Sequence, residues 1–290
     1  MTGEMPGGQP PTTDWADLWR SLVRMRSPVA GTPEPEPSDA WAERAREFDA
    51  YSRRRWQSMG TLRDGIRPRL LPTDRVLDIG AGTGAWTTWF AREAARVTAL
   101  DTSPAMLDRL HRNIAGEGID NVEVVRGRWP ETAVEPHDIA FCAHAMYGAE
   151  DLPAFVAAMN AVSRRECFFV IRHPASDSLM AEAATLVGRC HFTPSFQVAC
   201  NVLLDMGLHP DVRMEERSPG RERTSKSPET ALSEVKLRLD LGPEPTRFDQ
   251  HLREILDRRL VRRDGLVAWV ERSRSVLVRW SPRDEAPAAD

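Results

Sequence analysis

An α/β fold with a mostly parallel sheet and helices on both of its faces is the architecture that this sequence predicts. From Arg75 onward, apolar runs typical of strands alternate with amphipathic runs typical of helices, as in VLDI, GAWTTWFAREAA, VTALD and PAMLDRLHRNIA. The strand-like runs VEVV, DIAFCAH and CFFVI continue the series, and a glycine-rich turn follows the first strand. Strands that are apolar almost throughout, alternating with helices, are typical of a parallel sheet.

The segment before the sheet is expected to form helices joined by a linker. Residues 1–13 are rich in Gly, Pro and Thr and are expected to be disordered. Residues 14–66 are expected to hold N-terminal helices, with a proline-rich linker at residues 27–37 where helix is excluded. The helix expected near residues 39–59 either forms a lid over the site or closes the core, and it carries Tyr51, Arg55 and Trp56.

The segment after the fifth strand has a looser pattern. Helical spacing near residues 178–187 and 195–206 is followed by a short strand near residues 212–216, and a helical insertion is expected at about residues 218–263. The runs LVAWV and SVLVRW are separated by the charged turn ERSR and predict an antiparallel hairpin. The main domain is expected to span residues 67–282, with a disordered tail at 283–290.

Composition limits the classes of function. With 43 acidic and 39 basic residues the net charge is -4, which disfavours a protein held mainly by nucleic-acid phosphates. Arginine supplies nearly all the positive charge, a bias that indicates a GC-rich bacterial genome. The cysteines and histidines lack zinc-ligand spacing, so no metal is expected, and Cys142 and Cys167 are expected to be buried thiols. Without an apolar span or a secretory start, the expectation is a cytoplasmic protein with no membrane contact.

The turn Gly-Ala-Gly-Thr-Gly predicts a ligand close to the backbone, because Gly80, Gly82 and Gly84 carry no side chain to block its approach. The second strand ends at Asp101, whose carboxylate can accept hydrogen bonds from both hydroxyls of a ribose. A nucleoside is therefore expected. A dinucleotide enzyme almost shares this pattern, but Asp78 inside the first strand suits an ammonium group, and neither tyrosine has the lysine four residues later that short-chain dehydrogenases use.

Residues Arg75 to Arg172 resemble the class I S-adenosylmethionine-dependent methyltransferase superfamily, with its core motifs in order at normal spacing. The resemblance implies a Rossmann-like seven-stranded sheet of order 3-2-1-4-5-7-6 with an antiparallel terminal strand, whose neighbour lies near Val212 or Leu266. It implies S-adenosylmethionine as cofactor. The implied cofactor-binding residues are Asp78, Gly80, Ala81, Gly82, Gly84, Asp101, Thr102, Met106, Gly127, Arg128, Trp129, Ala143 and His144.

The adenine-side loop RGRWPE departs from many relatives, which have an acid where Arg128 stands. Arginine cannot accept a hydrogen bond from the adenine amino group. Contact with adenine there is expected through the backbone or through Trp129.

Three residues are candidates for proton transfer in the reaction. His144 follows the fourth strand, Tyr147 lies three residues further, and His173 follows the fifth strand. Histidine is the commonest general base, but a base is not obligatory for methyl transfer. The alternatives are a structural or cofactor-contacting role for His144, a pocket wall for Tyr147 and a solvated loop position for His173.

The function expected is methyl transfer to oxygen or nitrogen of a small molecule. An RNA methyltransferase is the first alternative, although AHAMYG replaces the NPPY-like run of amino-directed RNA enzymes. A non-catalytic partner protein that binds the cofactor without turnover is the second. The methyl acceptor and the oligomeric state are left open.

Overall fold

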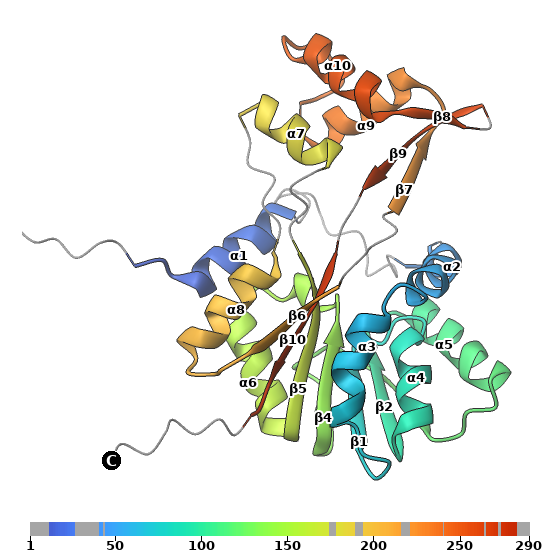
Figure 1. Ribbon diagram of the computed structural model, residues 1–290, viewed down its shortest axis with the longest axis vertical. Helices are drawn as coiled ribbons and strands as arrows, with labels where there is room; N and C mark the ends of the chain where they lie inside the picture. Colours follow the sequence, from blue (N-terminus) through green and yellow to red (C-terminus); the bar gives the residue numbers. More distant parts are fainter. Residues whose placement is uncertain are drawn as a thin grey trace, which may run out of the picture.

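The computed structural model describes residues 12–26, 41–42, 44–173, 178–188, 194–215, 221–239, 241–263, 265–271 and 274–282. Its main feature is a seven-stranded sheet of order β3-β2-β1-β4-β5-β10-β6 (Figure 1). The strands are β1 (Arg75–Ile79), β2 (Arg96–Asp101), β3 (Val122–Arg126), β4 (His137–Ala143), β5 (Ser163–Arg172), β6 (Asp211–Met214) and β10 (Ser275–Trp280).

The sheet confirms the expected strand order and the antiparallel terminal strand. Strands β3, β2, β1, β4 and β5 pair in parallel, whereas β10 runs antiparallel to both β5 and β6. Of the two candidate neighbours of the terminal strand, the one near Val212 is correct, since Val278 pairs with Val212. The carboxyl ends of β1, β2, β4 and β5 therefore meet at one edge, beside the start of β10.

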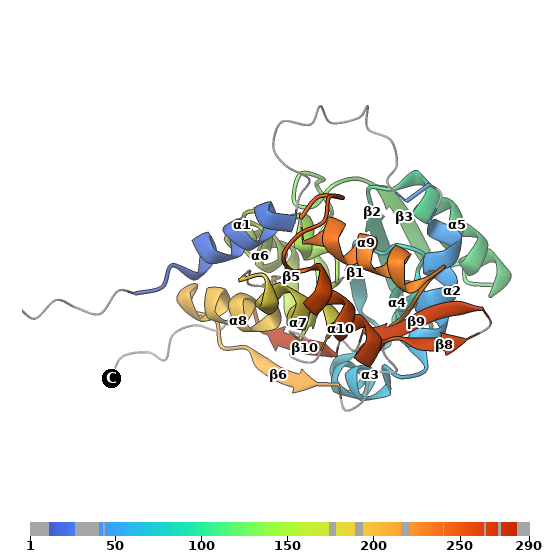
Figure 2. The same ribbon diagram turned by 90° about the horizontal axis from the view of Figure 1, so that it is seen from above.

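Helices cover both faces of this sheet because alternate strand residues point to opposite sides (Figure 2). On β5, Cys167 and Phe169 face one apolar cluster while Phe168 and Val170 face the other. The first face is covered by α1 (Trp15–Arg26), α6 (Leu152–Val162) and α8 (Phe196–Asp205). The second face is covered by α3 (Gly60–Ile66), α4 (Ala85–Glu93) and α5 (Pro104–Gly116), with α2 (Ala45–Trp56) beside α4 and α5.

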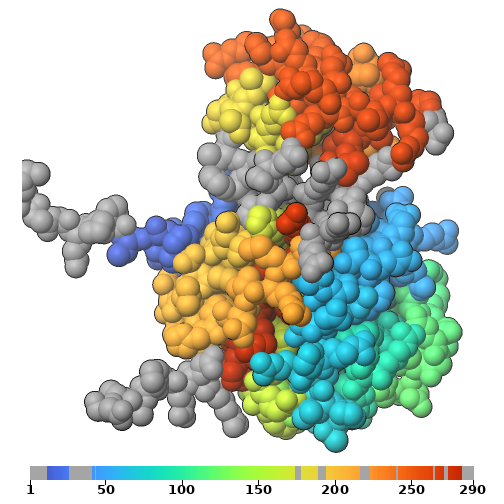
Figure 3. Space-filling model, viewed as in Figure 1, coloured from blue at the N-terminus to red at the C-terminus, as the bar shows by residue number. Residues whose placement is uncertain are grey.

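A second, smaller unit stands over the carboxyl ends of the parallel strands (Figures 1 and 3). We call it the cap unit. It has its own apolar core, in which Leu179, Val235 and Trp269 are buried. Its elements are α7 (Leu179–Leu186), β7 (Arg221–Ser225), α9 (Pro228–Arg238), α10 (Asp249–Arg259), β8 (Val261–Arg263) and β9 (Leu266–Glu271).

The expected hairpin between LVAWV and SVLVRW is wrong. The first run is β9, which is the centre of the three-stranded cap sheet β7-β9-β8, and the second is β10 in the main sheet. Each strand buries its apolar residues in a different core. Trp269 packs among the cap helices, and Trp280 packs in the layer of α1, α6 and α8 on the first face of the main sheet. The chain therefore crosses from one unit to the other between these strands.

The insertion before the last strand contains helices α9 and α10, as expected, together with strands β7 and β8. The boundaries proposed for the chain's units stay a prediction. The segments expected to be disordered at 1–13 and 283–290 lie almost entirely outside the described residues, and the linker at 27–37 lies outside them altogether. Among the helices in the described ranges, none combines the length and apolar character needed to cross a membrane.

Candidate active site

The turn between β1 and α4 is built on three glycines with left-handed backbone. The φ angle is +72° at Gly80, +56° at Gly82 and +89° at Gly84, a region that other residues adopt only at a cost in energy. A Cβ at Gly80 would lie 2.1 Å from the Ala145 side chain, and one at Gly84 would lie 2.1 Å from a leucine of α5. A Cβ at Gly82 would meet nothing closer than 3.6 Å. Packing thus requires Gly80 and Gly84, whereas Gly82 offers bare backbone to a ligand.

Asp101 lies against this turn at the carboxyl end of β2. Its Oδ2 accepts a hydrogen bond from the backbone N–H of Gly82 (2.9 Å), and its Oδ1 accepts one from the N–H of Ser103 (2.9 Å). These bonds hold the carboxylate at the ends of β1 and β2, and carboxylate oxygens accept hydrogen bonds from hydroxyl groups. The structure therefore brings together the glycine turn and the acid that the sequence paired.

Asp78 is buried beneath the same turn and accepts a hydrogen bond from Thr87 Oγ1 (2.6 Å). Burial raises the pKa of this carboxyl group to about 7, against the Thr87 hydrogen bond, which lowers it, while the nearby Asp101 adds to the rise. A neighbouring cation would stabilise the charged form of this buried acid.

Helix α2 lies over the glycine turn. The Phe48 ring is the group that a Cβ at Gly82 would approach. The next residue, buried Asp49, accepts hydrogen bonds from Arg109 (2.7 Å) and Asn113 (2.9 Å) of α5. The Asn113 amide also donates to the Thr83 carbonyl (2.8 Å). Burial favours a higher pKa for Asp49, but these bonds and the one from Arg53 hold it below its usual value. An anionic Asp49 thus joins α2, α5 and the glycine turn.

The same helix also contributes to the core. Trp56 packs edge-on against Trp86 of α4, with ring centroids 5.0 Å apart. Tyr51 is half-buried beside Phe48, at 6.5 Å between centroids. The amino-terminal part of α2 therefore covers the turn, and its carboxyl-terminal part closes the core.

The residues expected on the adenine side lie beyond Asp101 and β3. Thr102 is exposed, whereas Met106 is buried in the first turn of α5. The Gly127 N–H donates to the Asp101 carbonyl (3.0 Å), and a Cβ there would collide with a threonine side chain. Arg128 is exposed, 3.9 Å from Glu131. The Trp129 indole faces α6, where its Nε1 donates to the Phe155 carbonyl (3.2 Å).

His144 and Tyr147 form a connected pair where β4 ends. The His144 backbone is left-handed, with φ of 58°. Its Nδ1 lies 3.1 Å from the Tyr147 hydroxyl, and its Nε2 lies 3.2 Å from the Ser275 hydroxyl. The Tyr147 oxygen also accepts from the Arg172 N–H (2.6 Å), and the Tyr147 hydroxyl can donate its own hydrogen to His144 Nδ1 when that nitrogen carries no proton. Although the residue as a whole is exposed, desolvation of the ring, followed by the charges of Arg172 and Arg55, lowers the pKa of His144.

A buried ion pair behind His144 was missed by the sequence interpretation. Arg55 of α2 makes two hydrogen bonds with Glu215, and both side chains are nearly inaccessible. Arg55 Nη2 also donates to Ser275 Oγ (3.2 Å), and Glu215 accepts from the Ser275 N–H (2.9 Å). Glu215 follows an exposed strand, and its partner lies 160 residues away in the sequence, so no local pattern could have joined the two.

The remaining candidates lie around the same edge. Ala143 is the last residue of β4 and is half-buried. Ala81 packs against the α5 cluster. His173 stacks on Phe196 of α8 with centroids 5.3 Å apart, so its ring faces the first helical layer. Cys142 and Cys167 are buried free thiols, as expected, and burial raises the pKa of both.

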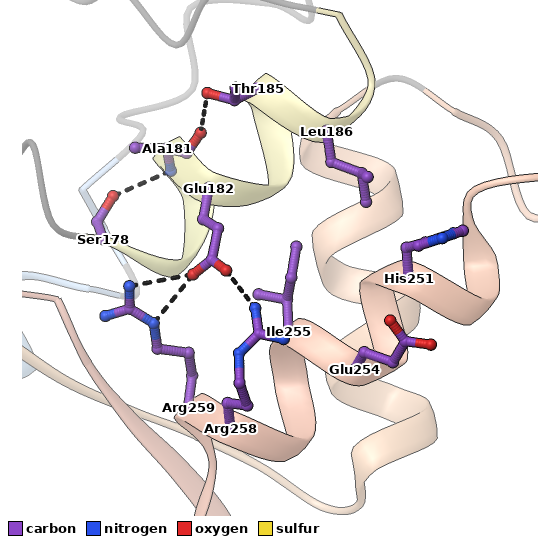
Figure 4. Close-up of a pocket in the computed structure, with 10 residues that line it drawn as sticks. All are labelled: Ser178, Ala181, Glu182, Thr185, Leu186, His251, Glu254, Ile255, Arg258 and Arg259. Atoms are coloured by element: carbon purple, nitrogen blue, oxygen red, sulfur yellow. Dashed lines mark hydrogen bonds and ion pairs between the residues drawn. The ribbon is translucent and has the colours of Figure 1, made fainter.

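A pocket of about 570 Å³ lies elsewhere, between α7 and α10 of the cap unit (Figure 4). Glu182 is held there by ion pairs with Arg258 and with Arg259, the latter at 3.0 Å. All the residues that line it belong to the cap unit, so it is separate from the glycine turn. The candidate active site is therefore the edge formed by Gly82, Asp101 and His144.

A family model described as a methyltransferase domain matches residues 76–166. This range begins in β1 and ends in β5, and it includes the glycine turn, Asp101, His144 and Tyr147. The YcgJ protein of Bacillus subtilis has a similar fold, with a TM-score of 0.51 and 14% identity over 79% of this chain and 99% of that one.

Curated relatives match over shorter stretches. The chain is 43% identical over 56 residues to a protein-L-isoaspartate O-methyltransferase of Methanoregula boonei, which is 19% of this chain and 26% of that protein. It is 32% identical over 93 residues to a malonyl-[acyl-carrier protein] O-methyltransferase of Serratia marcescens, 32% and 35% of the two chains. It is 30% identical over 112 residues to a ubiquinone biosynthesis O-methyltransferase of Hahella chejuensis, 37% and 47%. The chain thus spans between a quarter and a half of each relative's length.

Proposed function

We propose, from the premise that residues 76–166 form a class I S-adenosylmethionine-dependent methyltransferase domain, that this chain transfers a methyl group to oxygen or nitrogen of a small molecule. The observation that carries the proposal is the junction of Gly82 and Asp101, where backbone without a side chain and a carboxylate meet at the ends of two neighbouring strands. The similarity to the malonyl-[acyl-carrier protein] and ubiquinone biosynthesis O-methyltransferases supports a small methyl acceptor.

The residues present fit the cofactor. The Asp101 carboxylate suits a ribose diol. The buried Asp78, with its raised pKa, suits a ligand that carries an ammonium group, which would favour the carboxylate form. A Cβ at Gly82 would be in ordinary contact with Phe48, so the Phe48 ring would border a ligand held against this turn. We assign the adenine end to the neighbourhood of Thr102, Met106 and the loop at residues 127–129.

When bound, S-adenosylmethionine supplies a sulfonium methyl group: a bond from the acceptor oxygen or nitrogen to carbon forms as the sulfur–carbon bond breaks, and its electron pair stays on sulfur. The protein's contribution is then alignment and removal of a proton. When the Tyr147 hydroxyl donates to His144, the lone pair of His144 Nδ1 accepts that hydrogen bond. A proton from the acceptor would therefore reach His144 through the Tyr147 hydroxyl.

Calorimetric titration of the full chain with S-adenosylmethionine and S-adenosylhomocysteine tests the cofactor assignment. Binding of both is expected, together with at least tenfold weaker binding by Asp101→Ala, because a charge-assisted pair of hydrogen bonds is lost. The exposed Asp120→Ala serves as a matched control. Absence of heat with both ligands would refute the assignment.

The two alternatives give different results in a labelling experiment. Methyl label that enters RNA rather than molecules passing a small-pore filter would favour an RNA methyltransferase. Binding without transfer to either would favour a non-catalytic partner protein. Location in a bacterial cytoplasm stays a prediction from composition.

A further inference from the structure

Arg172 ends β5 and lies beside the residues expected to meet the methyl acceptor. Its guanidinium carbon lies 5.3 Å from the centroid of the Tyr147 ring, and its backbone N–H donates to the Tyr147 hydroxyl (2.6 Å). In the sheet it pairs with Ser275, the hydroxyl partner of His144. The residue is half-buried. The backbone pairing with Ser275 and the contact with the Tyr147 ring thus hold the Arg172 guanidinium at the carboxyl edge of the sheet.

The charge of Arg172 is not balanced by the protein residues that the structure describes. The other enclosed cations of this region have carboxylate partners: Arg55 pairs with Glu215, and Arg109 pairs with Asp49 at 2.7 Å. Across the described ranges, no carboxylate lies within ion-pair distance of the Arg172 guanidinium. Burying part of a cation without a counter-charge is costly, so the position favours an anion from outside the chain.

The neighbours of Arg172 add to this preference. The positive charge of Arg172 is one cause of the lowered pKa of the His144 imidazole. The Arg55 charge in the same region is already neutralised by Glu215. Tyr147 and Ser275 contribute hydroxyl groups rather than negative charge. An oxyanion in this space would therefore meet a cation that no carboxylate of the described residues balances, and no negative charge from Tyr147 or Ser275.

We propose that Arg172 binds an oxyanion, carboxylate or phosphate, on the methyl acceptor, so that the substrate is an acidic small molecule. A guanidinium stacked on an aromatic ring keeps its edge N–H groups free for two parallel hydrogen bonds to such a group. Binding there would place the acceptor beside His144 and Tyr147. The inference rests on the proposed function, because it assigns the substrate class of the same site.

The test separates candidate acceptors by charge before the reaction. A bacterial extract is passed through a small-pore filter that removes RNA and protein, and the filtrate is divided on an anion exchanger at pH 7. Each fraction is incubated with the full chain and methyl-labelled S-adenosylmethionine. Label is expected from the retained, anionic fraction. Loss of this acceptor activity after phosphatase treatment identifies a phosphate, and its persistence identifies a carboxylate; both support the proposal.

Three variants complete the test. Arg172→Gln is expected to lower transfer about tenfold or more through a higher KM, since a charged hydrogen-bonding partner is removed, and Arg172→Lys is expected to retain part of it. Arg96→Gln, at an exposed arginine that starts β2 and pairs with Glu123, is the matched control and is expected to react normally. All variants should bind S-adenosylhomocysteine like the unaltered protein.

Label arising from the unretained fraction, or an Arg172→Gln variant as active as the unaltered protein, would overturn the inference while leaving the methyltransferase assignment intact. Failure of the unaltered protein to bind S-adenosylhomocysteine, or to label either fraction, would instead refute the proposed function. The two failures are therefore distinguishable.

Discussion

Arg55 of α2 and Glu215 beyond β6 form a buried ion pair that connects the helix over the glycine turn with the strands behind His144. The pair shares Ser58 and Ser275 as hydrogen-bond partners, so few of its polar atoms face apolar surroundings. Such a pair adds little stability compared with a well-packed apolar pair, but removing one partner leaves a buried charge.

Glu215→Gln is expected to lower the free energy of unfolding by about 3–5 kcal/mol, because the Arg55 charge would remain buried without a counter-charge. Urea denaturation measures the change. Glu150→Gln is the control: it breaks an exposed pair with Arg24, at 2.8 Å, and should cost about 1 kcal/mol or less. Equal effects of the two substitutions would contradict the burial of the Arg55 pair.

Glycine substitutions can separate packing from ligand binding. Gly82→Ala is expected to fold, with a loss of about 1–2 kcal/mol from its left-handed backbone, and to lose most affinity for S-adenosylmethionine. Gly118→Ala has a similar φ of +65° with open space around it, so it should have the same cost in stability and no effect on binding. Thermal unfolding and calorimetry together measure both effects. Normal cofactor binding by Gly82→Ala would show that the cofactor does not bind against this turn.

Gly80→Ala should behave differently from both, because its Cβ would lie 2.1 Å from Ala145. Overpacking of this kind commonly costs a further 1–3 kcal/mol. The variant is expected to be much less stable than Gly118→Ala, as measured by urea denaturation. A stability equal to that of Gly118→Ala would show that the backbone here moves freely.

Asp78 predicts two effects of pH. Its pKa is raised to about 7, so the folded protein keeps a proton that the unfolded chain releases near its ordinary pKa of about 4. The free energy of unfolding should therefore fall as pH rises from about 4 to about 7, and level off above that. Asp78→Asn should remove this component in urea denaturation across the pH range; an unchanged profile would contradict the raised pKa.

Binding of a cofactor ammonium near Asp78 would favour the carboxylate, so binding at about pH 6.5 should release a proton. Calorimetry in buffers of different ionisation enthalpy counts that proton. Release by the unaltered protein and none by Asp78→Asn is expected. Equal proton release by the unaltered protein and by Asp78→Asn would show that the cofactor ammonium does not act on Asp78.

His144 and Tyr147 are tested as a proton path. His144→Asn and Tyr147→Phe should each reduce methyl transfer by about 10²–10⁴-fold if proton removal limits the reaction, with cofactor binding unchanged. Because the pKa of His144 is lowered, the imidazole is neutral at pH 7, and an unprotonated ring nitrogen can take part in the hydrogen bond with Tyr147. Transfer that is unchanged in both variants would leave alignment as the protein's main contribution.

The parts of the site that were predictable come from local sequence. The glycine turn and Asp101 lie at the ends of two strands that the apolar pattern identifies, and parallel pairing brings those ends together. His144 was placed in the same way, by the end of β4. Each of these predictions needs only the order of neighbouring strands.

The parts that were not predictable depend on distant contacts. Glu215 follows a strand whose residues are exposed, and its role comes from a helix 160 residues earlier. The hairpin was wrong because β9 and β10, although separated by only three residues, pack into different cores. A short polar turn does not reveal whether the chain reverses within one sheet or crosses to another.

The most direct test of the central claim is the fate of the methyl group of labelled S-adenosylmethionine incubated with the full chain and a filtered small-molecule extract. Methyl transfer by this chain predicts a labelled small organic product and an equal amount of S-adenosylhomocysteine, both lost in Asp101→Ala. No S-adenosylhomocysteine above the level of the protein-free reaction would contradict it.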